Sequence, residues 1–147
     1  MDITHPHLRD LHGYWQRKKA GRRLPARADV EPSEIPRLLP WIALVEITED
    51  LQRFFFRLAG TKIETFYGAK VSGRWLDELD FSEHNAAIAA QYAEAAQSGE
   101  PSVARFAFTK QDGRHLEYER VLLPLSSGGD KVDMLLIGYG LVTSYQT

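Results

Sequence analysis

The hydrophobic positions near the N-terminus recur with the period of a helix. Leu8, Leu11 and Trp15 stand at positions i, i+3 and i+7, which predicts one face of an amphipathic helix over residues 7–20, ending at Gly21. This apolar stripe is narrow and has no local element to pack on, so it must lie on the main body of the chain or on a second chain. The three residues are therefore our candidate dimer interface, and docking within one chain is the simpler alternative.

Proline dominates the next segment. Four prolines fall within residues 24–40, and proline at this density forbids a long helix or a central strand. We predict an extended lead-in with one short helical turn near residues 33–38. On this basis the chain divides into an N-terminal helix with its lead-in, residues 1–40, and a main domain, residues 41–147.

Beyond the lead-in the pattern is that of β-structure. Residues 41–48 and 53–60 are two apolar runs with a short polar gap, which predicts an antiparallel hairpin covered on both faces. Toward the C-terminus, residues 102–110, 115–125 and 132–142 are three further runs joined by glycine-containing turns. They predict a meander whose last strand is apolar enough to be central.

Between the hairpin and the meander the pattern becomes helical again. Thr61 and Glu64 match a capping box, which predicts a short helix that Thr61 caps and that ends at Gly68. Residues 83–98 are rich in alanine, the best helix former, and Gly99 follows them directly. They predict a longer helix, and its small side chains allow it to lie close to a neighbouring element.

Two glycines share one face of the last predicted strand. Gly138 and Gly140 stand two residues apart, and alternate residues of a strand point to the same side of a sheet. A glycine inside a strand often marks the place where another element or a ligand comes close. We therefore expect a helix or a ligand to pack against the sheet at this point.

The composition is that of one globular domain. The chain has 147 residues, of which 44% are hydrophobic and 26% charged, and its net charge of −2 gives no general attraction to nucleic acid or anionic lipid. The lack of cysteine excludes disulfides, thiolate metal sites and a cysteine nucleophile or photo-adduct. No signal peptide or membrane-length apolar run is present, so we expect a cytoplasmic protein without membrane contact.

Charge is unevenly distributed in one place. Residues 17–27 carry six Lys and Arg side chains and no acidic one. Such a run can contact a phosphate or a nucleic acid. We favour a solvated helix end, because cations in the last turn complement the helix dipole and no aromatic residues interleave with them. A nucleic-acid partner is therefore not expected, and a phosphate-binding role stays open.

The order of predicted elements and one motif resemble a PAS domain. The order is a helix, two strands, a helical crossover and three strands. The crossover contains a G-x-x-x-x-G-[RK]-x-x-x-[DE]-L signature, here Gly68, Gly73, Arg74, Glu78 and Leu79. More closely, the lead-in and first strands are similar to those of small stand-alone bacterial PAS-like proteins, first described as a domain of unknown function.

The resemblance, which covers residues 21–142, implies an α+β fold. The sheet would have five antiparallel strands in the order 2-1-5-4-3, with helices on one face and an extra N-terminal helix. A ligand pocket, where one exists, would lie between the sheet and the helices. PAS domains share this scaffold and differ in what it holds, so the resemblance names no ligand.

The search for a ligand site begins at Arg57, a charge inside an otherwise apolar strand and on the same face as Phe55. A buried guanidinium needs a partner. We favour an internal acid such as Glu64 or Glu119 over a ligand carboxylate or phosphate. The candidate ligand-binding residues are Phe55, Arg57, Phe66, Tyr67, Trp75, Tyr92, Tyr118 and Met134.

Cofactors are not required by the sequence. His84 falls where oxygen-sensing haem PAS domains carry their axial histidine, and it is a weak haem candidate. Non-covalent flavin binding also stays open, and no other metal site is predicted. No motif of nucleophilic, metal-dependent or nucleotide-dependent catalysis is present, so we expect no enzymatic activity.

Three functions fit these observations. We favour a non-enzymatic sensory or regulatory module for signal transduction, which forms a homodimer or binds a signalling partner protein. The second is a sensor with a small-molecule pocket between the sheet and residues 83–98. The third is a small enzyme on an unrelated α+β fold. The sequence identifies neither a ligand nor a partner.

Overall fold

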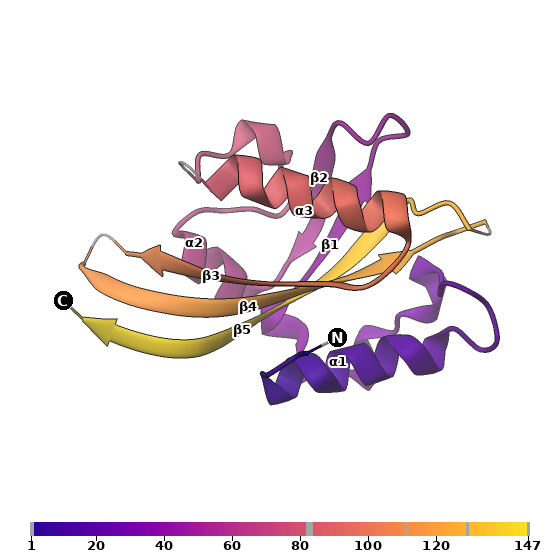
Figure 1. Ribbon diagram of the computed structural model, residues 1–147, viewed down its shortest axis with the longest axis horizontal. Helices are drawn as coiled ribbons and strands as arrows, with labels where there is room; N and C mark the ends of the chain where they lie inside the picture. Colours follow the sequence, from indigo (N-terminus) through magenta and orange to yellow (C-terminus); the bar gives the residue numbers. More distant parts are fainter. Residues whose placement is uncertain (1, 82–83, 111, 129, 147) are drawn as a thin grey trace.

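A five-stranded antiparallel sheet forms the centre of the molecule. The computed structural model describes residues 2–81, 84–110, 112–128 and 130–146 (Figure 1). The strand order is β2-β1-β5-β4-β3, which confirms the fold implied by the resemblance. The strands are β1 (Ile42–Ile47), β2 (Phe54–Ala59), β3 (Ser102–Thr109), β4 (Arg114–Leu125) and β5 (Met134–Gln146).

Helices cover both faces of this sheet. The α-helices are α1 (Pro6–Lys18), α2 (Thr61–Tyr67) and α3 (His84–Ser98), and the 3-10 turns are η1 (Arg27–Asp29), η2 (Pro32–Glu34), η3 (Leu39–Trp41) and η4 (Leu76–Glu78). Figure 1 shows α3 and α1 on opposite sides of the sheet. We call the face that packs against α2 and α3 the inner face, and the face that packs against α1 the outer face. No helix of the described residues is long and apolar enough to cross a membrane.

The outer face is closed by the chain's own N-terminal helix. A Cβ atom at Gly138 would lie 2.6 Å from Leu11 Cδ2 and 2.8 Å from Leu8 Cδ2, and one at Gly140 would lie 2.6 Å from the His5 ring. The two glycines thus leave the space into which the N-terminal segment packs. This confirms the expected close approach, and its source is a helix.

The apolar stripe of α1 is therefore not an exposed dimer surface. Leu8, Leu11 and Trp15 are only 2%, 1% and 1% exposed, and the Trp15 indole N–H donates to the Pro124 carbonyl oxygen at 2.8 Å. The sheet offers these side chains a glycine-lined groove within the same chain, so docking within the chain is the arrangement that forms. Dimerisation itself stays a prediction, without these three residues as its contact.

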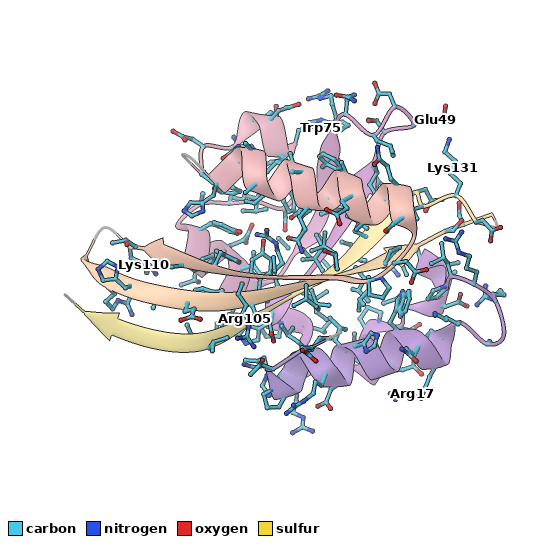
Figure 2. All side chains as sticks on the ribbon, in the orientation of Figure 1. Arg17, Glu49, Trp75, Arg105, Lys110 and Lys131 are labelled. Atoms are coloured by element: carbon cyan, nitrogen blue, oxygen red, sulfur yellow. The ribbon has the colours of Figure 1, made fainter. Side chains whose placement is uncertain are left out.

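The entry to α1 is held by a buried carboxylate. Glu119 on β4 is fully buried and accepts hydrogen bonds from the backbone N–H of Thr4 at 2.9 Å and of His5 at 2.7 Å. Arg105 on β3 completes the set, with its Nε at 3.3 Å from Glu119 Oε2. Figure 2 shows Arg105 on the side of the sheet that faces α1. A buried carboxylate is stable here because charged or backbone donors surround it.

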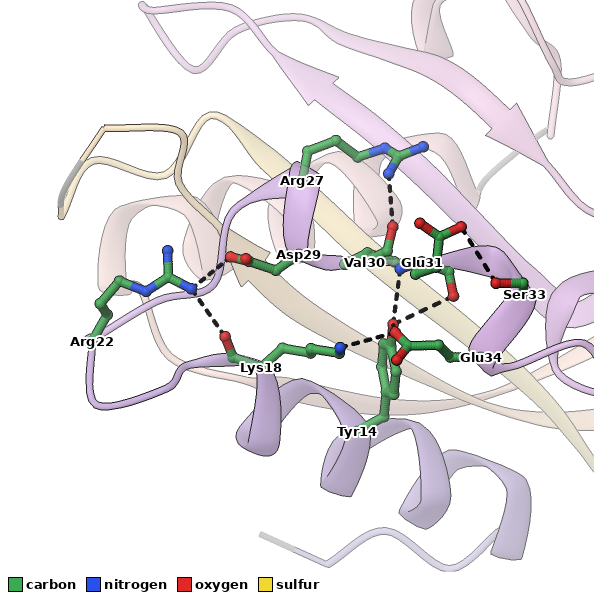
Figure 3. Close-up of polar contacts among 9 residues, drawn as sticks. All are labelled: Tyr14, Lys18, Arg22, Arg27, Asp29, Val30, Glu31, Ser33 and Glu34. Atoms are coloured by element: carbon green, nitrogen blue, oxygen red, sulfur yellow. Dashed lines mark hydrogen bonds and ion pairs between the residues drawn. The ribbon is translucent and has the colours of Figure 1, made fainter.

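Polar contacts fasten the lead-in to α1. The Tyr14 hydroxyl donates to Glu34 Oε1 at 2.8 Å and accepts from the Glu31 N–H at 2.8 Å, while Lys18 Nζ lies 2.9 Å from Glu34 Oε1 (Figure 3). Arg22 pairs with Asp29 at 2.6 Å. Lys18 and Arg22, two cations of the basic segment 17–27, thus have acidic partners within the chain. This agrees with a structural role for this end of the helix. The lead-in holds three 3-10 turns rather than one, and prolines occupy the first turn positions of two of them, Pro32 in η2 and Pro40 in η3.

The predicted capping box at α2 is wrong. Gly60, not Thr61, is the N-cap residue, and a Cβ there would collide with the Pro40 carbonyl oxygen of η3. Glu64 instead accepts hydrogen bonds from the backbone N–H groups of Val71 at 2.7 Å and Ser72 at 3.0 Å. The motif's acidic residue therefore organises the loop after the helix. The predicted helix end is confirmed, since Gly68 adopts a left-handed φ of 69°.

Candidate functional site

Strand β4 carries different chemistry on the two faces of the sheet. Alternation directs Glu119 to the outer face and its neighbours Tyr118 and Arg120 to the inner face. On β5, Tyr139 is the direct partner of Arg120 and therefore shares its face. Sheet geometry alone thus brings a guanidinium and a phenol together beneath α3.

Arg120 is a buried cation without an acidic partner among the described residues. Its side chain is 4% exposed, and its Nε donates to Gln91 Oε1 of α3 at 2.8 Å. The guanidinium carbon lies 4.8 Å from the centre of the Phe106 ring and 5.9 Å from that of Tyr139. Arg120 forms no ion pair with any carboxylate in the described part of the chain. Ring faces attract the cation but do not neutralise it.

Three tyrosine hydroxyls converge near this cation. The hydroxyls of Tyr67 on α2 and Tyr139 lie 2.8 Å apart. Tyr92 of α3 is fully buried, and its hydroxyl has no hydrogen-bond partner among the described residues. Burial first, and then the neighbouring Tyr139, raises the pKa values of Tyr67 and Tyr92 well above the ordinary range. Both are therefore neutral hydroxyls at physiological pH.

Aromatic rings surround these polar groups. The ring centres of Phe66 and Tyr118 lie 3.8 Å apart, and those of Tyr67 and Phe81 stack at 4.1 Å. Burial raises the pKa of Tyr118 to about 12. We name the four residues Tyr67, Tyr92, Arg120 and Tyr139 the polar centre, and Phe66, Phe81, Phe106 and Tyr118 the aromatic shell. The combination is a polar spot inside an otherwise apolar core.

Half of the predicted ligand residues meet at this place. Phe66, Tyr67, Tyr92 and Tyr118 all belong to the polar centre or its shell. Sequence reasoning missed Arg120, although it lies two residues after Tyr118 and so had to share its face. It also missed Tyr139, the residue between the two glycines.

Three other predicted residues lie elsewhere. Phe55 packs on Trp75 with ring centres 5.1 Å apart. The backbones of these two residues also pair, which places Trp75 beside the start of β2 (Figure 2). Phe55 pairs with Glu46, which in turn pairs with Met134, so all three share the outer face. Phe55 and Met134 therefore lie across the sheet from the polar centre. Trp75 belongs to no strand and packs on Phe55.

Arg57 is not a buried charge. Its side chain is 65% exposed, and its Nη1 lies 3.8 Å from Glu46 Oε1 on the neighbouring strand. The register of β1 and β2 shifts between Leu44 and Val45, which leaves Arg57 as the extra residue of a bulge on an edge strand. A bulge leaves its extra residue unpaired and bends the strand, so Arg57 faces solvent despite its apolar neighbours. The expected buried ion pair with Glu64 or Glu119 is therefore wrong, and the acid beside Arg57 is the exposed Glu46.

A surface cavity of about 220 Å³ opens between β2, η4 and the start of α3. Its polar groups already satisfy one another: Arg53 Nε lies 2.7 Å from Asp77 Oδ2, and the Asn85 amide donates to the Leu79 carbonyl oxygen at 2.9 Å. The guanidinium carbon of Arg53 also lies 4.0 Å from the centre of the Trp75 ring. This cavity therefore offers a ligand little unmet polar chemistry.

His84 is the first residue of α3, and its ring centre lies 6.3 Å from that of Phe106. It stands at the edge of the aromatic shell rather than in the polar centre. Among the described residues, no three His, Cys, Asp or Glu side chains gather to hold a metal ion. A haem role for His84 stays a prediction.

Comparisons with known proteins identify the class. Residues 3–139 match the family described as PAS domain, and the chain belongs to the PAS domain family. No curated protein matches it. Domains of this class serve as sensory modules in signalling.

Solved structures agree on the fold. One is a light-oxygen-voltage domain studied with a flavin analogue, with a TM-score of 0.56, 15% identity, and coverage of 76% of this chain and 83% of that one. Another is a light-oxygen-voltage protein from Rhodobacter sphaeroides, with a TM-score of 0.53, 15% identity, and coverage of 77% of this chain and 69% of that one. A third is the PAS domain of a protein from Colwellia psychrerythraea, with a TM-score of 0.51, 14% identity, and coverage of 76% of this chain and 96% of that one. At this identity the likeness establishes the scaffold alone.

Proposed function

We propose that this PAS domain is a non-enzymatic sensor that holds a small molecule on the inner face and signals through a protein partner. The polar centre carries the proposal. An apolar core gains nothing from a buried, acid-free guanidinium or from a buried hydroxyl without a partner, and each costs free energy unless a bound group compensates it. A ligand between the sheet and α3 would supply the missing partners.

The chemistry of the centre favours binding over catalysis. Tyr67 and Tyr92 stay protonated at physiological pH because their pKa values are raised, so neither is a ready base. Arg120 stays charged and can only donate hydrogen bonds. Such groups orient and neutralise a ligand rather than move its protons.

The shell favours a small ligand over a flavin or a haem. Two pairs of aromatic rings beneath α3 have centres only 3.8 Å and 4.1 Å apart, so these side chains are closely packed. A macrocycle or a three-ring flavin would need several of these side chains to move together. A molecule with one small ring or less needs these side chains to move far less.

The route to a partner is proposed along β4. Tyr118 and Arg120 face the ligand site, while Glu119 between them holds Thr4 and His5 at the start of α1. A shift of this strand would therefore be felt on both faces of the sheet. Since the apolar stripe of α1 is buried, a partner or a second copy would contact other surfaces.

Native mass spectrometry of protein purified from cells tests this proposal. We expect an added non-peptide mass that is lost on denaturation. The Arg120→Met variant should lose the mass, whereas Arg57→Ala should keep it, because Arg57 is exposed and outside the site. Protein that carries no added mass and gains none from a cell extract would contradict a ligand-binding function.

A further inference from the structure

The polar centre holds a cationic hydrogen-bond donor and, among the described residues, no anionic acceptor. Arg120 donates through Nε to Gln91, and its guanidinium also interacts with the Tyr139 hydroxyl, so both of these partners are neutral groups. Its terminal nitrogens carry further N–H groups, and the Tyr92 hydroxyl adds another donor without a partner. Gln91 is held at both ends of its amide, since its nitrogen donates to Ser102 Oγ at 3.1 Å. The missing partner is an acceptor, and beside a cation the best acceptor is an anion.

The charge state of the centre agrees with this. Burial lowers the pKa of the Arg120 guanidinium, but Tyr139, Tyr92 and Tyr67 raise it, and the net shift is upward. The guanidinium is therefore a fixed positive charge. Planar carboxylates match its fork with two parallel hydrogen bonds.

The surroundings select the rest of the ligand. Phe66 and Tyr118 pack on Phe106, whose ring face lies toward the Arg120 guanidinium, and this suits a flat apolar group and not a fully hydrated ion. Phe106 is only half-buried and lies on β3, at the edge of the sheet.

We propose that the site takes a small carboxylate with a flat apolar body, of which benzoate is the simplest example. Its carboxylate accepts hydrogen bonds from Arg120 and from the Tyr92 hydroxyl, and its ring inserts among the rings of the shell. This inference rests on the proposed ligand-binding function and specifies its chemical class. The competing account is that Arg120 is a structural cation stacked between Phe106 and Tyr139 and that Tyr92 fills space.

The variant Tyr92→Phe separates the two accounts. The hydroxyl has no partner in the ligand-free protein, so its removal should leave the thermal stability of the free protein equal or higher. Loss of a hydrogen bond to a charged group should nevertheless weaken benzoate binding about tenfold. A tyrosine that merely fills space would show no change in binding.

The experiment titrates the full-length chain with benzoate, benzamide and inorganic phosphate by isothermal calorimetry. We expect benzoate to bind the wild type and Arg57→Ala with equal affinity. Its affinity should be about tenfold lower for Tyr92→Phe and roughly a hundredfold or more lower for Arg120→Met. Benzamide, a neutral isostere, and phosphate, an anion without an apolar body, should bind far more weakly than benzoate. Thermal denaturation of each variant alone shows whether it is folded.

The outcomes distinguish the inference from the proposal beneath it. Equal affinities for benzamide and benzoate would refute the claim that the ligand is an anion, while a small-molecule pocket would still stand. Phosphate binding as tightly as benzoate would refute the claim that the ligand needs an apolar body. Benzoate binding that Tyr92→Phe leaves unchanged, or no binding of benzoate at all, would refute the inference, and the added mass in protein from cells would then decide the proposed function separately.

Discussion

Replacing Glu119 by glutamine should loosen the N-terminal segment from the outer face. The buried carboxylate accepts the N–H groups of Thr4 and His5 at 2.9 Å and 2.7 Å, and Arg105 Nε lies 3.3 Å away. Glutamine keeps one oxygen but turns an NH₂ group toward donors that then lack an acceptor. Hydrogen bonds to a charged group contribute about 1.5–3 kcal/mol each, and Arg105 is half-exposed, so we expect the free energy of unfolding to fall by about 2–4 kcal/mol.

The same residue predicts a pH dependence. Burial raises the pKa of Glu119, but the His5 and Thr4 N–H groups and Arg105 outweigh it and hold the pKa below its ordinary value of 4.5. A carboxyl group whose pKa is lower in the folded state stabilises the protein above the unfolded pKa, and this stability is lost as the pH falls through the folded pKa. The difference in unfolding free energy between wild type and Glu119→Gln should be full at neutral pH and shrink in acid.

Urea denaturation followed by tryptophan fluorescence measures both effects, because Trp15 of α1 is buried against the sheet. The matched control is Glu117→Gln, a half-exposed acid on the same strand, which should change the unfolding free energy by less than about 0.5 kcal/mol. Equal unfolding free energies for wild type and Glu119→Gln at pH 7 would refute the reasoning.

The remaining predictions use the same denaturation assay. Gly138→Ala should cost about 1–3 kcal/mol of unfolding free energy, since its Cβ would lie 2.6 Å from Leu11 Cδ2, and an unchanged value would show that α1 is loosely packed. Gly60→Ala should cost more than Gly138→Ala, because it would collide with the Pro40 backbone, which cannot rotate away as a leucine tip can; the opposite ranking would contradict this packing. Arg57→Ala should change the value by less than about 0.5 kcal/mol, and a loss of several kcal/mol would mean that its exposed ion pair matters more than solvent screening allows.

The fold was predictable to a large extent. Hydrophobic patterning predicts the strands and α1, while capping signals and alanine content predict α2 and α3, and the signature from Gly68 to Leu79 connects them to the PAS scaffold. The strand ends are less accurate: β5 was predicted to stop at Val142 and continues to Gln146, where it still pairs with Arg114 of β4. Pairing with a neighbour sets the length of a strand, and the local pattern does not contain it.

The candidate site was predictable only in part. Tyr92 and Tyr118 were identified from their aromatic character, and both lie on the inner face. Arg57 was chosen because a charge among apolar neighbours suggests burial, whereas a bulge at an edge strand exposes it. Arg120 shows its importance only once the sheet pairs it with Tyr139 and α3 covers it. These contacts join residues far apart in the sequence, so they depend on the tertiary structure and cannot be read from the local pattern.

The central claim is that a small molecule binds at the polar centre, and nuclear magnetic resonance of the side chains tests it most directly. The Arg120 Nε–H is held by Gln91, and Tyr92 is fully buried, so both should give resolved signals in protein labelled at arginine and tyrosine. Titration with benzoate should shift both signals to saturation and leave the exposed Arg57 signal in place. Arg120 and Tyr92 signals that stay unmoved through the titration would contradict the account.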